Sequence, residues 1–334
     1  MTFIDSFLSD HYRDFGLDRF GVGPDWESIL LTPRFPTSRH VVALVFAPGS
    51  REPKLVVKVP RQPGDNASVR NEASVLRGLM SAGGGSATGV PEVVGSKDVG
   101  PYTVLVETAL TGTPLDPRLV AADLPRAVAA GVEFVRMLPL TAAENTHWYE
   151  RTVTSPLEAL AALTGKQTAM AALMDRTHKL LAPLRNARLP AVVEHGDLSH
   201  PNLFLKHNDG LQVVDWERSR TDGIPGHDLV FYLQYLSESS EGAFSREEQL
   251  AAFEKAFGRG GWALEPLLAH LEVRGVDAAL VELLVAATWV RSAATLALRL
   301  EGENSMSAGS TAVQAAVESD RDFWLWRHVV ERAA

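Results

Sequence analysis

The sequence predicts an α+β protein with two lobes, a small N-terminal lobe built on an antiparallel sheet and a larger helical C-terminal lobe. Two features of the chain support this prediction. β-Branched runs separated by proline and glycine occupy its N-terminal part, which is typical of strands joined by tight turns. After Pro114, alanine and leucine become frequent and apolar residues recur at helical spacing, with no further strands apart from one hairpin. We place the boundary between residues 110 and 111, giving lobes of residues 1–110 and 111–334.

Composition excludes several classes of protein. The chain has 334 residues, enough to bury about three quarters of its unfolded surface, and its 46% hydrophobic and 22% charged residues are ordinary for a globular protein. The net charge of -9 argues against a nucleic-acid partner, which requires clustered lysine and arginine. Because cysteine is absent, neither disulfides nor thiolate metal sites are expected, in agreement with a reducing cytosol.

No segment predicts a membrane partner. The start of the chain carries Asp5, Asp10 and Asp14 among its apolar residues, unlike the basic start and continuous apolar core of an export signal. The longest apolar region, Ala278 to Leu300, is interrupted by charged residues, which are costly inside lipid. We therefore expect a cytoplasmic protein in which this region forms a buried helix.

The N-terminal lobe is expected to begin with a helical segment from Phe3 to Phe20 and to continue as strands. The β-branched runs Val41–Ala47 and Lys54–Val59 flank a turn rich in proline and glycine, which predicts a hairpin. Alternate side chains of a strand share a face, so Lys58 lies opposite the apolar residues on either side of it. Such a lysine must reach an anion or water; taken alone, it could also be an edge-strand lysine that discourages aggregation.

A helix from Ala67 to Met80 follows, with apolar residues at helical spacing. Glu72 lies one turn from Leu76, close enough to the apolar stripe to point inward beneath the sheet. A solvated glutamate flanked by arginines is the alternative reading, because such charges are common on helix surfaces.

The lobes are joined by an apolar strand within Tyr102–Gly112, which passes into a stretch of small residues. A buried strand leading into a linker would look the same with or without a ligand nearby. The helices expected in the second lobe are Leu119–Leu138, Pro156–Leu163, Gln167–Leu184, Ser245–Phe257, Pro266–Val273, Asp277–Leu300 and Thr311–Ala333.

The segment from His195 to Glu217 predicts a loop followed by a hairpin. Its apolar runs Leu203–Leu205 and Leu211–Val214 are joined by the sequence Asn-Asp-Gly at residues 208–210, whose residue types tolerate the positive φ of a tight turn. The hairpin can therefore fold back on itself within a short length of chain.

Oxygen-bearing side chains lie at the ends of this hairpin. Folding about the turn brings Asn202 beside Asp215 and Glu217, and Asp197 precedes Asn202 by a loop short enough to stay in reach. Convergent carboxylate and amide oxygens suit a hard cation such as Mg²⁺, with water or phosphate in its remaining positions. Turn-forming polar residues without a metal are the alternative for any one of these positions taken alone.

The sequence HGD at residues 195–197, followed by Asn202 and by Asp215 at the end of an apolar strand, resembles the catalytic core of the kinase-like phosphotransferases. The motifs HGD and DWE are similar to those of the aminoglycoside phosphotransferase and choline kinase family, which phosphorylates small molecules. Ser199 stands where protein kinases have a lysine, which favours this branch. The resemblance covers roughly residues 26–237. It implies a two-lobed protein-kinase-like fold, with a nucleotide-binding N-terminal lobe and a catalytic and acceptor-binding C-terminal lobe.

The resemblance assigns roles around the hairpin. Asp197 resembles the residue that orients or deprotonates the acceptor hydroxyl, and Asn202 and Asp215 resemble the magnesium ligands. His195 resembles a residue that braces the catalytic loop. Asp228 resembles the aspartate that supports this loop from below, although an aspartate near a helix start is also a good partner for the helix dipole.

The same resemblance implies contacts with the nucleotide. Lys58 resembles the lysine that touches the phosphates, and Glu72 resembles the glutamate that pairs with it. Glu107 and Ala109 resemble the hinge positions whose backbone groups hydrogen-bond the purine of ATP or GTP.

The turn Thr32–Arg39 departs from the kinase pattern because it contains no glycine, and Pro33 and Pro36 remove two backbone donors. Members of the small-molecule branch often carry hydroxyl residues there. Thr37 and Ser38 are therefore expected to contact phosphate through side chain and backbone.

The implied activity is magnesium-dependent transfer of the γ-phosphate of ATP or GTP to a hydroxyl group of a small-molecule acceptor. An antibiotic of the aminoglycoside or nucleoside type, inactivated by phosphorylation, is the first expectation. A metabolic sugar or amino-alcohol kinase and a non-catalytic nucleotide-binding regulatory module are the alternatives. The tryptophans of the C-terminal helices do not identify the acceptor, because aromatic residues favour burial whether or not a ligand is present. The sequence also has no dense acidic cluster that would require a polycationic acceptor.

Overall fold

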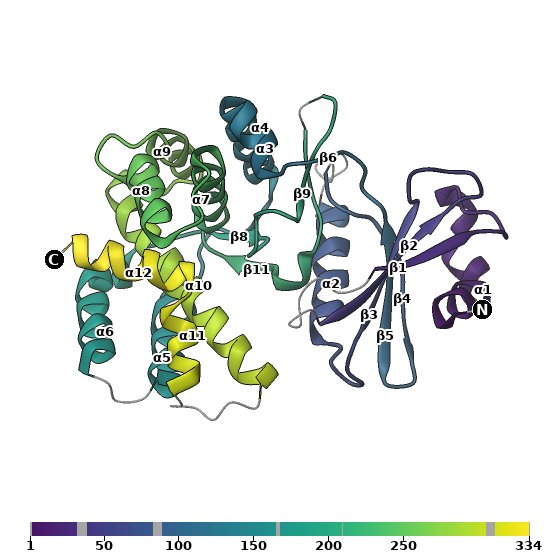
Figure 1. Cartoon of the computed structure of the whole chain (residues 1–334), viewed down its shortest axis with the longest axis horizontal. Coiled ribbons are helices and arrows are strands. Elements are labelled where there is room, and N and C mark those ends of the chain that lie inside the picture. The colour runs from purple at the N-terminus through teal and green to yellow at the C-terminus, as the bar shows by residue number, and fades with distance from the viewer. Residues whose placement is uncertain are drawn as a thin grey trace. The chain divides into compact units, whose positions relative to one another are not determined.

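The computed structural model describes residues 2–31, 39–82, 89–164, 168–208, 210–304 and 311–333, which form two compact units (Figure 1). The first unit contains Met1–Leu115, Met137–Pro139 and His195–Arg220, and the second contains Asp116–Arg136, Leu140–Glu194 and Thr221–Ala334. The segment with the HGD and DWE sequences thus belongs to the same compact unit as the N-terminal strands. The assignment of functions to lobes divided at residue 110 stays a prediction.

The first unit is built on a five-stranded antiparallel sheet in the order β1-β2-β3-β5-β4. Its strands are β1 (Glu27–Leu31), β2 (His40–Phe46), β3 (Leu55–Pro60), β4 (Val93–Val99) and β5 (Tyr102–Thr108). The predicted hairpin is confirmed as β2 and β3. Because β3 pairs with a strand on each side, the edge-strand explanation for Lys58 is wrong.

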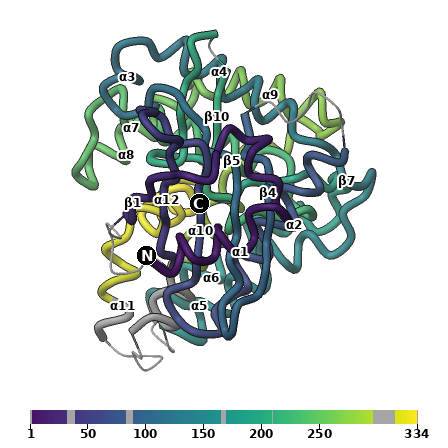
Figure 2. Tube along the Cα trace, turned by 90° about the vertical axis from the view of Figure 1, so that its right-hand side faces the viewer, coloured from purple at the N-terminus to yellow at the C-terminus, as the bar shows by residue number. Residues whose placement is uncertain are grey.

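Two helices cover opposite faces of this sheet (Figure 1). Helix α1 (Phe3–Phe15) packs its apolar stripe, including Phe7 and Leu8, on Leu55 and Val57. Figure 2 views the molecule from the side on which α1 lies. On the other face, α2 (Ala67–Ala82) packs against Leu105. The alternation of β3 thus directs Leu55, Val57 and Val59 toward α1, and Lys58 together with Val56 toward the face of α2.

The hairpin expected after Asn202 forms a small sheet of its own in the order β10-β9-β6, from β6 (Thr113–Pro114), β9 (Leu203–Leu205) and β10 (Leu211–Val213). Leu203 pairs with Val213 in its register. The next residues outward are also joined, because the Val214 N–H donates to the Asn202 carbonyl at 3.0 Å. The predicted hairpin is therefore confirmed, while residue 209 of its turn lies outside the described residues.

The second unit is mostly helical, as predicted. Its helices are α3 (Pro117–Ala122), α4 (Leu124–Met137), α5 (Ser155–Thr164), α6 (Thr168–Leu181), α7 (His227–Glu241), α8 (Arg246–Phe257), α9 (Leu264–Val273), α10 (Val281–Asn304), α11 (Thr311–Glu318) and α12 (Arg321–Arg332). The single helix expected over Leu119–Leu138 is divided at Asp123, whose N–H ends α3 and whose carboxylate accepts the Arg126 N–H at 3.1 Å in the first turn of α4.

The expectation of no further strands was wrong for this unit. A sheet in the order β11-β8-β7 forms from β7 (Leu140–Ala142), β8 (Ala191–Glu194) and β11 (Arg220–Gly223). These strands have three or four residues, too few for an alternating pattern to be recognised.

Helix α10 is the apolar centre of the second unit, with Ala286, Trp289 and Val290 fully buried. Within the described residues, one 18-residue window, Ala278–Thr295, is apolar enough to cross a membrane, with a mean hydropathy of 1.3. However, 61% of this window is buried inside the protein. The window therefore has the character of a core helix, as the sequence predicted.

Candidate active site

A buried lysine and glutamate pair lies between β3 and α2. The Lys58 ammonium donates to Glu72 Oε1 at 2.6 Å, and the two residues are 5% and 0% exposed. Burial alone would lower the pKa of Lys58, but the nearby carboxylates of Glu107 and Glu72 outweigh it and raise that pKa well above its ordinary value. Lys58 is therefore a permanent cation, and Glu72 points inward rather than to solvent.

Two further carboxylates surround the lysine. Asp215 Oδ1 and Glu107 Oε1 each lie 3.4 Å from the Lys58 ammonium. Glu107 is 1% exposed, and burial raises its pKa to about 8 against the opposing attraction of Lys58. Burial likewise raises the pKa of Glu72. Three carboxyl groups thus surround a single ammonium group. The excess of acidic groups favours binding of a further cation beside them.

Glu107 and Ala109, the residues predicted to contact the purine, have specific surroundings. The carboxylate of Glu107 faces the lysine cluster, a role that the sequence pattern did not suggest, because it depends on β5 lying beside β3 with Glu107 opposite Val56. The Ala109 N–H donates to the Lys54 carbonyl at 2.9 Å. Binding of a purine through this N–H would therefore require that bond to open.

Asp215 follows β10 in a left-handed conformation, with φ 69° and ψ 64°, which is uncommon for a residue other than glycine. The next N–H, that of Trp216, donates to Glu72 Oε1 at 2.8 Å. One glutamate oxygen therefore contacts both the lysine and the backbone beside Asp215. The Trp216 ring is fully buried and packs edge-on against His195, with 4.8 Å between centroids.

The loop that contains His195, Asp197 and Asn202 is held by its own side chains. His195 is fully buried; its Nε2 lies 3.1 Å from the Val214 carbonyl, and its Nδ1 accepts the Asp197 N–H at 3.2 Å. Burial lowers the pKa of His195, so the neutral ring can donate at one nitrogen and accept at the other. The Asn202 amide donates to the Asp197 carbonyl at 3.1 Å. These bonds fix the loop between β8 and β9.

Asp197 itself meets a cation that the sequence pattern did not indicate. Its Oδ2 lies 3.3 Å from Arg218 Nη1, and both side chains are 28% exposed. Gly196 adopts φ 82°, and a Cβ there would lie 2.8 Å from the Arg218 carbonyl oxygen. The close approach of these two segments therefore depends on glycine.

Glu217 does not join Asn202 and Asp215, and this part of the sequence-based expectation was wrong. Its Oε2 pairs with His40 Nδ1 on β2 at 3.0 Å. Although burial would raise it, the hydrogen bond with His40 lowers the pKa of Glu217 to about 2. The short helical turn after Asp215 directs this side chain toward the five-stranded sheet, away from the end of the hairpin.

An apolar surface lies beside the lysine cluster, on the sheet face opposite α1. Residues directly opposite one another in an antiparallel pair share a face. Two rows result, one of Lys58, Val42 and Leu31 and one of Val56, Leu44 and Ile29. Ile29 and Leu31 are 53% and 43% exposed. Exposed aliphatic side chains next to buried charges are typical of a ligand-binding surface.

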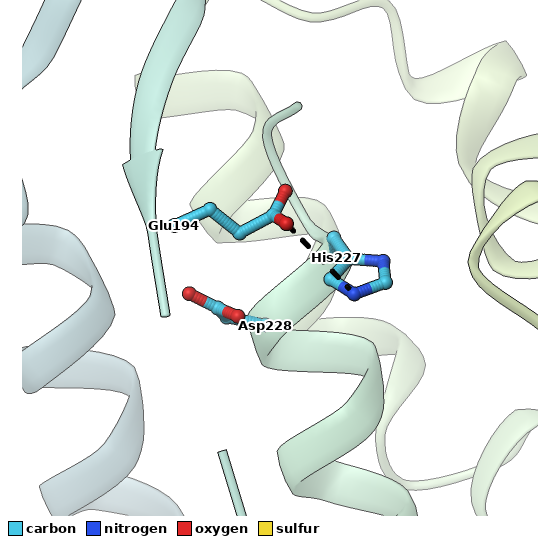
Figure 3. A group of neighbouring side chains, drawn as sticks. All are labelled: Glu194, His227 and Asp228. Carbon is cyan, nitrogen blue, oxygen red and sulfur yellow. Dashed lines mark ion pairs between the residues drawn. The ribbon is translucent and has the colours of Figure 1, made fainter. Parts of the chain in front are cut away.

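Thr37 and Ser38 lie outside the described residues. Asp228 lies in the second unit, 4% exposed, at the start of α7 (Figure 3). There it neighbours Glu194, at the end of β8, and His227, with ligand atoms of all three within 4.8 Å of one another. Its predicted role beneath the catalytic loop stays a prediction.

This buried cluster is an ion-pair network in its observed form. Arg291 donates both terminal nitrogens to the Glu194 carboxylate, and His227 Nε2 lies 3.9 Å from it. Burial would raise the pKa of Glu194, but the charges of Arg291 and His227 lower it to about 2. The guanidinium thus already supplies the positive charge that a metal would bring. A neighbouring cavity of about 10 Å³ admits roughly one water molecule.

Asp215 and Asn202 fit a divalent cation better. They end adjoining strands of the hairpin, and the Asp215 side chain is 41% exposed beside the acid-rich lysine cluster. The Asn202 side-chain nitrogen donates a hydrogen bond to the Asp197 carbonyl. The Asn202 side-chain oxygen is therefore the atom of this residue that could bind a metal. A carboxylate and an amide oxygen are hard ligands that leave positions for water and phosphate.

Comparison with known proteins agrees with this geometry. The model of the phosphotransferase enzyme family matches residues 40–267. Among solved structures, aminoglycoside phosphotransferase APH(4)-Ia is 13% identical with a TM-score of 0.59, covering 98% of this chain and 99% of its own. An aminoglycoside 2'-phosphotransferase-IIIa variant bound to GDP is 15% identical with a TM-score of 0.53, covering 93% and 96%. A proposed fructosamine-3-kinase from Thermobifida fusca YX-ER1 is 17% identical with a TM-score of 0.50, covering 92% and 93%.

No curated protein matches the chain by sequence. At these identities the structural likenesses establish the kinase-like fold, while the family match spans more than half of the chain. The chain therefore belongs to the phosphotransferase enzyme family, and it is a small-molecule phosphotransferase that acts on a hydroxyl group.

Proposed function

We propose that this chain is a magnesium-dependent kinase that transfers the γ-phosphate of ATP or GTP to a hydroxyl group of an antibiotic of the aminoglycoside or nucleoside type. The observation that carries the proposal is the convergence of Lys58, Glu72 and Asp215 within one unit. The same hairpin that ends at Asp215 carries Asp197 and Asn202.

Each residue has a role that follows from its surroundings. Lys58, oriented by Glu72, pairs with phosphate oxygens of the nucleotide, and Asp197 positions the acceptor hydroxyl for in-line attack. Asp215 and Asn202 would hold Mg²⁺, which when bound would offset the negative charge of the phosphates. His195 keeps Asp197 in place through the backbone. Because the transition state of phosphoryl transfer is loose, positioning and electrostatics matter more here than base strength.

The apolar rows on the sheet face give the purine a surface. The side chains of Ile29, Leu44 and Val56 lie on the same face as Lys58, so a purine that packs on them can extend its phosphates toward the ammonium. Aliphatic contacts accept either purine, which is why the proposal names ATP and GTP together. Thr37 and Ser38 are proposed to contact the phosphates, and Glu107 and Ala109 to flank the purine.

Similar structures support both substrates. A thermostable mutant of APH(4)-Ia forms a ternary complex with AMP-PNP and hygromycin B, and amicoumacin kinase hAmiN forms a complex with AMP-PNP and Ca²⁺. We extend this to a nucleotide donor, a divalent cation and a hydroxyl-bearing acceptor for this chain. A cytoplasmic location, without membrane or nucleic-acid partners, completes the proposal.

A metabolic sugar or amino-alcohol kinase is the second candidate. In the second unit, Asp222 is paired with Arg151 at 2.9 Å and Glu194 with Arg291. Arginines that neutralise acids suit a neutral acceptor, or one with a single positive charge, better than a polycation.

A panel of acceptors tests the proposal. The protein is incubated with Mg²⁺ and ATP or GTP, together with aminoglycosides, nucleoside antibiotics, sugars or amino alcohols, and mass spectrometry detects products that are one phosphate heavier. Asp197→Ala should abolish transfer while magnesium-nucleotide binding persists in calorimetry. If the folded protein binds magnesium nucleotide and yet modifies no acceptor in a broad panel, the non-catalytic regulatory module becomes the better explanation.

A further inference from the structure

Two consecutive residues of α2 hold the turn that follows the catalytic hairpin, residues Asp215–Ser219, here named the 215–219 turn. Glu72 accepts the Trp216 N–H at 2.8 Å. Asn71 donates its side-chain amide to two carbonyl oxygens, that of Glu217 at 3.1 Å and that of Ser219 at 2.9 Å. Glu72 also orients Lys58, whereas the two bonds of Asn71 go only to the 215–219 turn.

The 215–219 turn needs such restraint. Asp215 is left-handed at φ 69°, which costs an L-residue roughly 1–2 kcal/mol and persists only where the surrounding structure holds it. The Asp215 side chain is 41% exposed, so packing alone does not fix it. Its direction is therefore set by the backbone together with the contact of its Oδ1 with the Lys58 ammonium at 3.4 Å, and the backbone is held through the bonds to α2.

An asparagine suits this position chemically. Its NH₂ group carries two hydrogens, one for each carbonyl, and it brings no charge near the proposed metal site. The two accepting carbonyls lie on either side of Arg218, whose guanidinium lies 3.3 Å from Asp197. Asn71 thus restrains both ends of the segment that carries Arg218, while Glu72 restrains the residue after Asp215.

We propose that Asn71 is a positioning residue that keeps Asp215 in its metal-binding conformation by bonding the 215–219 turn to α2. This inference rests on the proposed function, since it assigns a metal to Asp215. Helix α2 then positions the phosphate-binding lysine through Glu72 and the metal-binding aspartate through Asn71. A disturbance of either bond alters the metal site without touching its ligands.

The effect on metal binding follows from populations. When the binding-competent conformation is only partly populated, the apparent affinity falls in proportion to its fraction. Loss of two hydrogen bonds at about 1 kcal/mol each predicts a loss of roughly thirtyfold or more in metal affinity for Asn71→Asp, whose carboxylate would also repel both carbonyls. Asn71→Ala removes the bonds without the repulsion, so its loss should be smaller.

Mn²⁺ serves as the metal probe. Electron paramagnetic resonance measures its binding to the full-length protein in the presence of AMP-PNP, for wild type, N71A and N71D. The matched control is N66D. Asn66, in the same unit, donates its amide to the Pro101 carbonyl at 3.0 Å and accepts the Thr103 N–H at 2.7 Å, away from the turn. We expect N66D to bind Mn²⁺ like wild type even if it lowers thermal stability.

Hydrogen exchange of the nucleotide-free protein provides a second measurement, independent of metal and nucleotide. Peptides covering residues 211–220 should exchange faster in N71A and N71D than in wild type, while those covering β2 and β3 should not. Wild-type Mn²⁺ affinity in a folded N71D variant, or an equal loss in N66D, would overturn the inference. Absence of nucleotide binding by wild type would instead refute the proposed function, and unchanged exchange at residues 211–220 would refute the restraint itself.

Discussion

Replacing Arg291 by methionine should destabilise the second unit strongly at neutral pH, because it leaves Glu194 buried without its partner. Glu194 is 1% exposed and bonded to both terminal nitrogens of Arg291 and to the Ile224 N–H at 3.2 Å. Its folded pKa of about 2, against an ordinary 4.5, corresponds to about 3 kcal/mol of stabilisation of the carboxylate. Removing one member of a buried ion pair costs roughly 3–5 kcal/mol, which agrees with that value.

The sign of the pH dependence follows from these values. In wild type, the folded pKa lies below the unfolded one, so this stabilisation is complete above pH 4.5 and is lost as the pH falls toward 2. In R291M, burial is opposed only by His227 and by the bond from the Ile224 N–H, so the pKa of Glu194 rises. The free energy of unfolding of the variant should therefore fall furthest below that of wild type at pH 7, and less near pH 4, where Glu194 can take up a proton.

Urea unfolding at both pH values measures the difference, followed by tryptophan fluorescence, since Trp289 lies in the same helix as Arg291. The double variant E194Q/R291M is the control and should recover much of the loss, because it removes the unpaired charge. A penalty below about 1 kcal/mol at pH 7, or a double variant no more stable than R291M, would refute the reasoning.

Three other substitutions test the first unit. The folded pKa of Glu107, about 8, exceeds its ordinary value of 4.5, so wild type should lose stability as the pH rises between these two values. Glu107→Gln should reduce this loss. Urea unfolding curves that are the same at pH 5 and pH 8 for both proteins would contradict this prediction. Gly196→Ala should lower the melting temperature and the transfer rate, because its Cβ would lie 2.8 Å from the Arg218 oxygen at φ 82°; an unchanged rate would exclude this effect on Asp197. Leu55→Ala, at a fully buried position, should cost about 3 kcal/mol in urea unfolding, and a loss below about 1 kcal/mol would show that the core beneath α1 can collapse.

The parts of the site that sequence predicted well depend on local chain geometry. The distance from Asn202 to Asp215 is spanned by one hairpin, so their proximity follows from two apolar runs and a turn. Strand alternation places Lys58 opposite the α1 face, and helical spacing directs Glu72 inward.

The parts that sequence did not predict depend on contacts between distant segments. Glu107 reaches Lys58 only because β5 pairs with β3, and nothing in either strand specifies that order. Glu217 was expected beside Asn202, but the helical turn after Asp215 directs it to His40. Asn71 carries no motif, since a polar residue on a helix surface has the same pattern whether or not it contacts a carbonyl far along the chain.

The three carboxylates around Lys58 have a consequence for the stability of the first unit. Even with Glu107 protonated, Glu72 and Asp215 together exceed the single positive charge of the lysine by one. Like charges held together oppose folding, and a cation that binds only the folded state stabilises it by mass action. Under the proposed function, the charge arrangement that attracts a metal should therefore also make the thermal stability of the unit respond to metal concentration, before any nucleotide or acceptor is present.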